Sequence, residues 1–214
     1  MNTREYSPFD RLIGLVDDAI KTAFGPAPAE SRPNPARTVN EGELTGADRD
    51  LAARFMRINH AGEVCAQALY QGQALTAHLP EVRGKMEQSA QEENDHLAWT
   101  AERLREFGSH TSVLNPFWYA GSFAIGALAG IAGDKWSLGF VAETEKQVVA
   151  HLDSHLSRLS PSDHKSRAIL EQMKIDEGHH ATVAIEHGAA TLPEPVRQLM
   201  HLSSKVMTKT AFWI

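Results

Sequence analysis

Hydrophobic residues recur three and four positions apart along most of the chain, and no segment is predicted to be a strand. Long amphipathic helices are expected over residues 45–78, 81–107, 135–159 and 162–190. Shorter amphipathic helices are expected over residues 7–24 and 195–208. The pattern predicts an all-α protein, in which four long helices form a bundle and additional N- and C-terminal amphipathic helices pack around it.

Helix boundaries are marked by capping and breaking residues. Thr45 followed by Asp48 predicts a capping box that opens the first long helix. Ser160 with Pro161 predicts an N-cap and first turn for the fourth, which Gly188 is expected to end.

The proline-rich segment 25–38 is interpreted as a linker without helix, poorly ordered unless it packs along the main domain. We therefore divide the chain into an N-terminal extension, residues 1–44, and one helical domain, residues 45–214.

The middle of the chain is unusually apolar. Residues 107–133 contain no Asp, Glu, Lys or Arg, and residues 117–133 form a run of 17 positions rich in small side chains. This run is either a buried core helix or an interfacial segment that touches a membrane. A membrane span is the weakest of three interpretations, because the run is short and lacks flanking basic clusters. The apolar C-terminus, residues 211–214, is expected to dock onto the domain.

Composition narrows the classes of function. The net charge of −6 gives no basic field for a nucleic-acid partner. The single cysteine, Cys65, excludes an internal disulfide, fits a reducing compartment and is expected to be a small core residue. Residues 1–5 lack the layout of a signal peptide. Eleven histidines raise the expectation of a metal site without locating it.

Two Glu-x-x-His pairs carry the candidate chemistry. Glu93 with His96, and Glu177 with His180, lie 84 residues apart, each within a predicted helix. Residues three apart on a helix project from one face, so each pair can offer an oxygen and a nitrogen to one metal ion. Glu93 also lies in the middle of an apolar stripe, where an unpaired carboxylate would be very costly to bury. Coordination of a metal would remove this cost.

Helical phase selects between neighbouring candidates. Glu145 lies on the apolar face of the third long helix, whereas Glu143 points to the opposite side. By the same test His180 lies at the edge of the inner stripe and His179 faces away. In the first long helix Glu63 lies 30 residues before Glu93, on the flank of the apolar stripe. No other acid stands between residues 50 and 81, so nothing competes with Glu63.

Four Glu and two His on four antiparallel helices form the ligand pattern of di-iron and di-manganese carboxylate proteins. A buried salt-bridged network would explain one Glu-x-x-His pair better than a metal does, but it explains six positions in two matched halves poorly. His60, His151 and His155 lie close enough in sequence to compete, and we expect them to form hydrogen bonds around the site rather than to ligate. No nucleotide-binding glycine motif follows a predicted strand.

Several motifs together resemble the demethoxyubiquinone hydroxylase family. They are Arg57-Ile58-Asn59-His60-Ala61-Gly62-Glu63, Glu93-Asn94-Asp95-His96-Leu97, Glu145 with His151, and Asp176-Glu177-Gly178-His179-His180-Ala181. The resemblance covers about residues 45–214 and includes all six ligand positions.

The resemblance implies a ferritin-like di-iron monooxygenase, peripheral to the cytoplasmic face of the cell membrane. Two iron ions would be held by six catalytic ligands: Glu63, Glu93 and His96 for one ion, and Glu145, Glu177 and His180 for the other, with Glu93 and Glu177 bridging. The implied partners are a polyprenylated methoxy-benzoquinol, O₂, an unidentified electron donor, the membrane surface and other proteins of ubiquinone biosynthesis.

Two other hypotheses stay open at the level of sequence. The chain could be a ferritin-like iron-binding or peroxide-scavenging protein, although the charge-free residues 107–133 argue against a hydrophilic cage. It could also be a membrane-docked interaction protein whose Glu and His clusters are structural.

Overall fold

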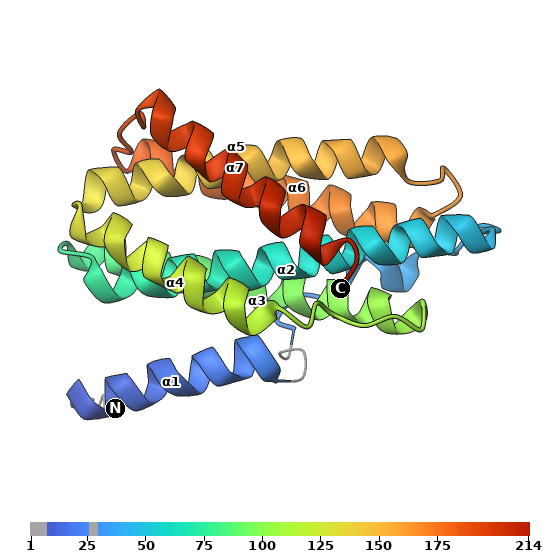
Figure 1. The fold of residues 1–214 in the computed structure, drawn as a ribbon, viewed down its shortest axis with the longest axis horizontal. Helices are drawn as coiled ribbons and strands as arrows, with labels where there is room; N and C mark the ends of the chain where they lie inside the picture. The colour runs from blue at the N-terminus through green and yellow to red at the C-terminus, as the bar shows by residue number, and fades with distance from the viewer. Residues whose placement is uncertain (1–7, 26–29) are drawn as a thin grey trace.

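A computed structural model describes residues 8–25 and 30–214, and every regular element in these ranges is a helix (Figure 1). The all-α class is confirmed. Residues 1–7 and 26–29, the latter in the predicted linker, lie outside the described part. The elements are α1 (Pro8–Phe24), the 3₁₀ helix η1 (Pro35–Thr38), α2 (Gly46–Thr76), α3 (Pro80–Glu106), α4 (Asn115–Ile131), α5 (Asp134–Arg158), α6 (His164–Glu186) and α7 (Glu194–Ala211).

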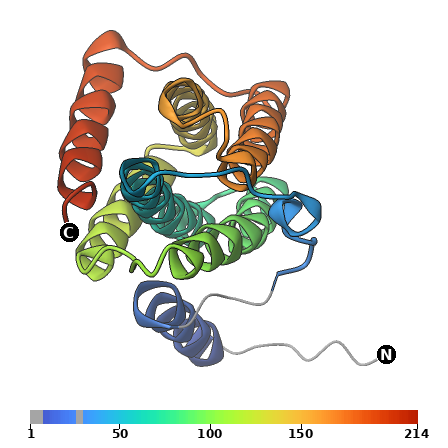
Figure 2. The ribbon, with the colours of Figure 1, turned by 90° about the vertical axis from the view of Figure 1, so that its right-hand side faces the viewer.

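The bundle consists of two helical hairpins. The link 77–79 joins α2 to α3, and the link 159–163 joins α5 to α6. Both links are short, so each pair runs antiparallel. Figure 2 views the four helices nearly end on, with α7 and α4 along one outer side of the bundle and α1 beneath it. α4 connects the hairpins and packs along α2, and α7 crosses the outside of α2 and α5.

The helix starts were predicted with mixed success. The capping box at Thr45 is confirmed: its Oγ1 accepts from the Asp48 backbone N–H at 3.2 Å, and Asp48 accepts from the Thr45 N–H at 3.0 Å. The prediction of a cap at Ser160 is wrong. Asp163 caps α6 instead and accepts from the Ser166 N–H at 3.0 Å. Its carboxylate is also held by the buried Arg103 of α3, a tertiary partner that local sequence does not reveal.

The segment read as a helix-free linker contains the short helix η1. The Asn34 side chain caps it by accepting from the Ala36 N–H at 2.9 Å, while Pro35 occupies the first position. Residues 30–42 pack along the bundle, and η1 contacts α6. Of the two possibilities stated for this segment, poor order or packing along the main domain, the second is therefore observed. The division of the chain at residue 45 stays a prediction.

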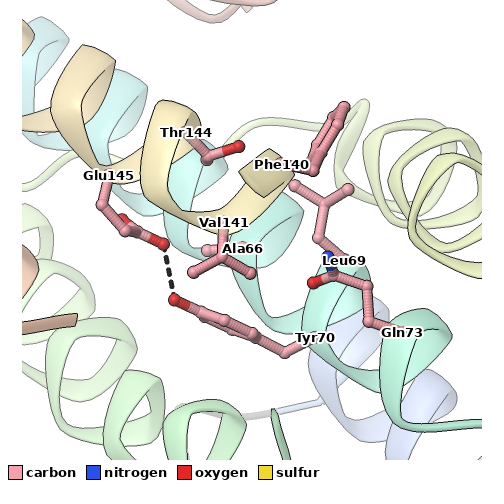
Figure 3. A pocket seen from close by; sticks show the side chains of 8 residues that line it. All are labelled: Ala66, Leu69, Tyr70, Gln73, Phe140, Val141, Thr144 and Glu145. Carbon is pink, nitrogen blue, oxygen red and sulfur yellow. Dashed lines mark hydrogen bonds between the residues drawn. The ribbon is translucent and has the colours of Figure 1, made fainter. Parts of the chain in front are cut away.

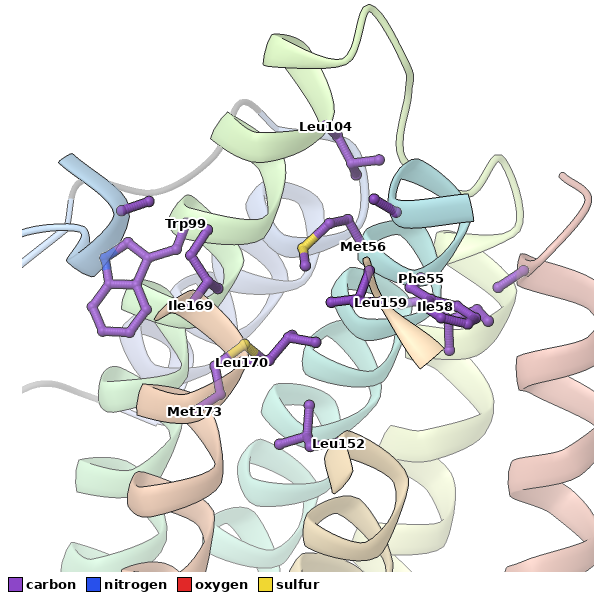
Figure 4. Packing of buried hydrophobic residues seen from close by; sticks show 14 of the residues in the cluster. Phe55, Met56, Ile58, Trp99, Leu104, Leu152, Leu159, Ile169, Leu170 and Met173 are labelled. Atoms are coloured by element: carbon purple, nitrogen blue, oxygen red, sulfur yellow. The ribbon is translucent and has the colours of Figure 1, made fainter. Parts of the chain in front are cut away.

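A hydrophobic cluster fills one end of the bundle (Figure 4). Its largest members are nearly or fully inaccessible to solvent and come from all four long helices: Phe55, Met56, Trp99, Leu152, Leu170 and Met173. Each such side chain stabilises the fold by about 1.5–3 kcal/mol relative to exposure. The cluster fixes the spacing of the four helices that carry the candidate ligands.

The apolar middle run forms α4 and is only half buried. A Cβ added at Gly126 would collide with the Leu69 carbonyl oxygen, and one at Gly72 would collide with that of Phe123. The small residues therefore allow α4 and α2 to pack backbone against backbone. The opposite face leaves Phe117 and Leu128 exposed by 73% and 66%, so the buried core helix is wrong for that face. Within the described ranges, no helix has the length and hydropathy needed to cross a membrane.

The two ends of the chain cover the bundle to different extents. In α1, Ala19 and Ala23 pack against a cluster built from α2, α3 and α4. At the C-terminus Ala211 is fully buried and Arg54 lies 4.9 Å from the Phe212 ring centroid. Trp213 remains 68% exposed. Arg54 also lies 4.5 Å from the Trp213 ring centroid, so the predicted docking of the terminus extends to Trp213, whose outer face stays exposed.

Candidate metal centre

The fold brings all six predicted ligand side chains into one buried cluster. α2 supplies Glu63, α5 supplies Glu145, and the remaining four come from the Glu-x-x-His turns of α3 and α6. These side chains form two groups that share Glu177. The first group is Glu63, Glu93, His96 and Glu177, and the second is Glu145, Glu177 and His180. Within each group the potential ligand atoms lie within 4.8 Å of one another.

Two carboxylates link the halves of the cluster. Glu93 places Oε2 3.0 Å from His96 Nδ1 and Oε1 3.4 Å from His180 Nδ1. Glu177 places Oε1 3.1 Å from His96 Nδ1 and Oε2 3.2 Å from His180 Nδ1. Each of these carboxylates therefore has one oxygen beside each imidazole. Glu63 lies only beside His96, with Oε2 3.5 Å from Nδ1, although phase had placed it on the flank of the stripe.

Burial and mutual contact shift the protonation of all six groups. Burial raises the pKa of Glu63 and of Glu145, and nearby carboxylates add to the rise. Burial also disfavours charge on His96 and His180, but hydrogen bonds to carboxylates outweigh it and raise the pKa of both, that of His180 to about 12. The same imidazoles overcome burial to hold the pKa of Glu93 and Glu177 below the ordinary value. Without metal, these directions favour neutral Glu63 and Glu145, ionised Glu93 and Glu177, and protonated His96 and His180.

The donor set fits metal ions. Among the described residues, Glu93 Oε1 and Glu145 Oε2 are buried without a hydrogen-bond partner. Buried polar atoms in this condition commonly indicate an absent water or ion. Carboxylate oxygens with one imidazole nitrogen per ion suit iron or manganese. The two groups contain no cysteine, whose thiolate would favour zinc.

Metal loading is expected to release protons. Two divalent ions bound by four carboxylates and two neutral imidazoles form a neutral centre, as does the metal-free arrangement. Loading therefore displaces about four protons, from Glu63, Glu145, His96 and His180. Affinity should fall roughly tenfold per released proton for each pH unit lowered. Calorimetry with Mn²⁺ in two buffers of different protonation enthalpy measures this number, and release of fewer than about two protons would contradict the assignment.

Each imidazole is also held from behind by an acid of the other hairpin. His96 Nε2 lies 2.9 Å from Asp176 Oδ2, and His180 Nε2 lies 2.7 Å from Glu92 Oε2. Asp176 and Glu92 directly precede Glu177 and Glu93, so the two contacts repeat one arrangement across the bundle. Sequence reasoning missed both acids. The available signal was an acid before the Glu of each Glu-x-x-His pair. Such partners orient an imidazole and leave Nδ1 free to face a metal.

Tyr70 is a further residue that sequence reasoning missed. Its hydroxyl donates to Glu145 Oε1 at 2.5 Å in the buried space between α2 and α5 (Figure 3). A pocket beside this contact is lined by Ala66, Leu69, Tyr70, Gln73, Phe140, Val141, Thr144 and Glu145. It brings a largely apolar surface up to the Glu145 half of the centre. Tyr70 lies seven residues after Glu63 on the same helix face, which was the only signal in the sequence.

The competing residues lie outside the cluster. His155 stacks on Phe55 with ring centroids 4.0 Å apart and its Nδ1 lies 3.0 Å from Asn59 Oδ1. His60 is buried, and burial lowers its pKa to about 4. His151 stacks edge-on against His155. None of the three forms a hydrogen bond to a candidate ligand within the described chain, so the expected supporting role is not observed.

Two other sequence predictions concern residues near the centre. Cys65 is of intermediate exposure and its thiol lies beside Ser122 of α4, so it lies at the edge of the core rather than fully inside it. Glu143 bonds Gln147 on the outer face of α5, and His179 is exposed, so phase separated both correctly from Glu145 and His180.

Comparison with known proteins gives a consistent result over nearly the whole chain. The family model described as "Ubiquinone biosynthesis protein COQ7" matches residues 50–211. A 3-demethoxyubiquinol 3-hydroxylase of Nitrosococcus oceani is 59% identical over 214 residues, which is all of both chains. The protein of the same name from Stutzerimonas stutzeri is 57% identical over 211 residues, covering 99% of this chain and 98% of the relative.

Proposed function

The chain belongs to the COQ7 family of ubiquinone biosynthesis proteins, and from this premise we propose that it hydroxylates a demethoxyubiquinol ring at a centre of two iron ions. Hydroxylation as a step of ubiquinone biosynthesis follows from the family and from full-length relatives named for that activity. The metal's identity and the ligand roles are inferences from the site. The comparisons do not support the two other hypotheses, a ferritin-like iron-binding or peroxide-scavenging protein and a membrane-docked interaction protein with structural Glu and His clusters.

One observation carries the proposal: Glu93 and Glu177 each direct one oxygen toward each imidazole. In this assignment Glu63, Glu93 and His96 would hold one iron and Glu145, Glu177 and His180 the other, and Glu93 and Glu177 would be shared by both ions. When bound, the iron pair supplies the activation of O₂ that no acid or base in the chain can provide.

The protein's own residues prepare and protect this centre. Asp176 and Glu92 fix the imidazole rings, and Tyr70 fixes the Glu145 carboxyl, so the ligands are positioned before metal arrives. The hydrophobic cluster of Figure 4 excludes water from one end of the bundle. A dry site strengthens every electrostatic contact within it. A monooxygenase needs a donor of two electrons, and we propose that such a donor and other proteins of ubiquinone biosynthesis bind this protein. No site on the surface is assigned to them.

The outer helices give the protein a surface for a membrane. We propose that it is peripheral to the cytoplasmic face of the cell membrane, where a polyprenylated substrate resides. Exposed apolar side chains gather on α1, α4 and α7: Ile20, Phe24, Phe117, Leu128, Ile131, Leu199, Leu202 and Val206. These helices lie along the outside of the bundle in Figure 2. Burial of such side chains in the interface of a bilayer is favourable.

Leu128→Asp is expected to weaken binding to vesicles of phosphatidylethanolamine and phosphatidylglycerol several-fold, because a charge replaces an apolar contact on α4. Flotation of the purified protein measures the bound fraction. Ile175→Asp on α6 is the matched control, since Ile175 is 64% exposed and Leu128 66%. Equal loss in both variants, or binding unchanged in the first, would argue against this surface.

The proposed activity is tested by the quinone content of a strain from which the gene has been deleted. Mass spectrometry should show accumulation of the demethoxy precursor and restoration of the hydroxylated product by the wild-type gene. An unchanged quinone profile on deletion, together with purified protein that takes up no iron, would refute the function.

A further inference from the structure

Residues 30–42, which precede the part of the chain matched by the family model, form a strap across the outside of α3 and α6. Ser31 donates to Asp95 through its backbone N–H at 2.5 Å and its hydroxyl at 2.9 Å. At the other end the Gly42 N–H donates to the Ser162 carbonyl at 3.1 Å. The strap therefore closes over the two helices that carry the Glu-x-x-His pairs.

Arg32 of the strap reaches the metal centre through one intermediate residue. Its Nη2 lies 2.9 Å from Asp176 Oδ2, the oxygen that also lies 2.9 Å from His96 Nε2. Its Nε donates to Asp95 at 2.8 Å, and its guanidinium lies 5.1 Å from the centroid of Trp99. A hydrogen bond to Asp95 and the Trp99 ring thus hold the guanidinium, and its close ion pair with Asp176 places a positive charge against the carboxylate behind His96.

The other half of the centre lacks this support. Glu92, which stands behind His180, is 38% exposed at its side chain, against 14% for Asp176. Within the described chain its remaining hydrogen bond comes from Gln88, a neutral partner on the same helix. The two halves share one plan, yet among the described residues only the His96 half is closed by a cation from outside the bundle.

We propose that Arg32 is a positioning residue that makes the His96 half the tighter of the two metal positions. This inference rests on the proposed metal centre. Arg32 holds Asp176, Asp176 holds His96, and the imidazole then meets the first ion without a cost of reorientation. The Arg32 side chain is 40% exposed, but that of its partner Asp95 is only 1% exposed, so loss of the guanidinium is expected to lower stability as well as metal affinity. The effect that identifies positioning is therefore selective: it falls on one metal step and leaves the other unchanged.

The test is a Co²⁺ titration of the metal-free, full-length protein, followed by visible absorbance. Wild type should bind two ions in a tight and a weaker step. Arg32→Met should weaken the tight step by about 10- to 100-fold and leave the weaker step unchanged. Glu92→Gln should do the converse, because it loosens the His180 half. Arg32→Lys, which retains the charge without the planar fork, should lie between wild type and Arg32→Met.

Two controls separate positioning from mere loosening of the strap. Arg37→Met removes a strap arginine that pairs with Glu30 and Glu102 instead of Asp176, and Asn34→Ala removes the cap of η1. Both should keep the tight step. An unchanged tight step in Arg32→Met, or equal weakening in either control, would overturn the role of Arg32. Wild-type protein that binds no Co²⁺ or Fe²⁺ would instead refute the metal centre itself.

Discussion

Glu177→Ala is expected to abolish both metal binding and ring hydroxylation while the helical fold remains. Glu177 lies 3.1 Å from one imidazole and 3.2 Å from the other, and its side chain is 2% exposed. Its loss removes a carboxylate that lies beside both imidazoles and that we propose to be shared by both ions. Loss of a residue that only hydrogen-bonds to a metal ligand lowers activity by up to about 100-fold. Loss of Glu177 itself should therefore lower activity by more than this. Metal analysis after anaerobic loading with Fe²⁺, and the quinone profile of the complemented deletion strain, measure the two effects.

The fold should survive because the imidazoles can adapt. Removal of the carboxylate leaves His96 and His180 free to lose their protons, which avoids two uncompensated buried charges. Circular dichroism checks the helical content. His179→Ala is the matched control, since this neighbouring histidine is exposed and should retain iron and activity. A Glu177→Ala protein that still holds two ions would show that the shared-ligand assignment is wrong.

Arg103→Met is expected to produce the largest loss of stability, about 3–5 kcal/mol in the free energy of unfolding. Arg103 is 3% exposed and joins α3 to the start of α6. Its Nη2 donates to Asp163 at 2.8 Å, its Nε donates to Ser166 at 2.9 Å, and it also pairs with Glu41 and Glu106. Methionine fills a similar volume but leaves the Asp163 carboxylate, 1% exposed, without its cation.

Urea denaturation of the metal-free protein measures this loss. Lys165→Met is the control. Among the described residues the Lys165 ammonium pairs only with the half-exposed Glu106, at 3.1 Å, so this substitution should cost less than about 1 kcal/mol. Similar losses in both variants would show that the Arg103 network contributes no more than a surface pair.

Periodicity and capping determine most of the helices before any tertiary contact is known. The Thr45 capping box begins α2 because its hydrogen bonds lie within one turn. The start of α6 could not be placed in the same way. Asp163 caps it while paired with Arg103, some 60 residues earlier in the chain, whereas Ser160 offered a local alternative of equal quality. The half-buried state of α4 was equally hidden, since an apolar helix has no polar face to show which side is packed.

The candidate ligands also follow from phase. Glu145 rather than Glu143, and His180 rather than His179, point inward because helical geometry fixes direction around the axis. Their meeting at the centre of the bundle is then a consequence of packing four amphipathic helices around one core. Glu63 is the exception, because it lies on the flank of its stripe and reaches His96 only through the way α2 faces α3.

By itself, then, the sequence determined most of the helices and the inward faces that bring Glu93, His96, Glu145, Glu177 and His180 together. The sequence places an acid directly before each inward Glu, but only tertiary structure decided that these acids stand behind the imidazoles. Asp176 and Glu92 sit one residue before the inward Glu177 and Glu93, about 100° away around their helices, so phase directs them off the core. They reach His96 and His180 only because α3 and α6 lie side by side. Likewise Arg32 joins the centre through contacts far apart in sequence, which periodicity within one helix cannot encode.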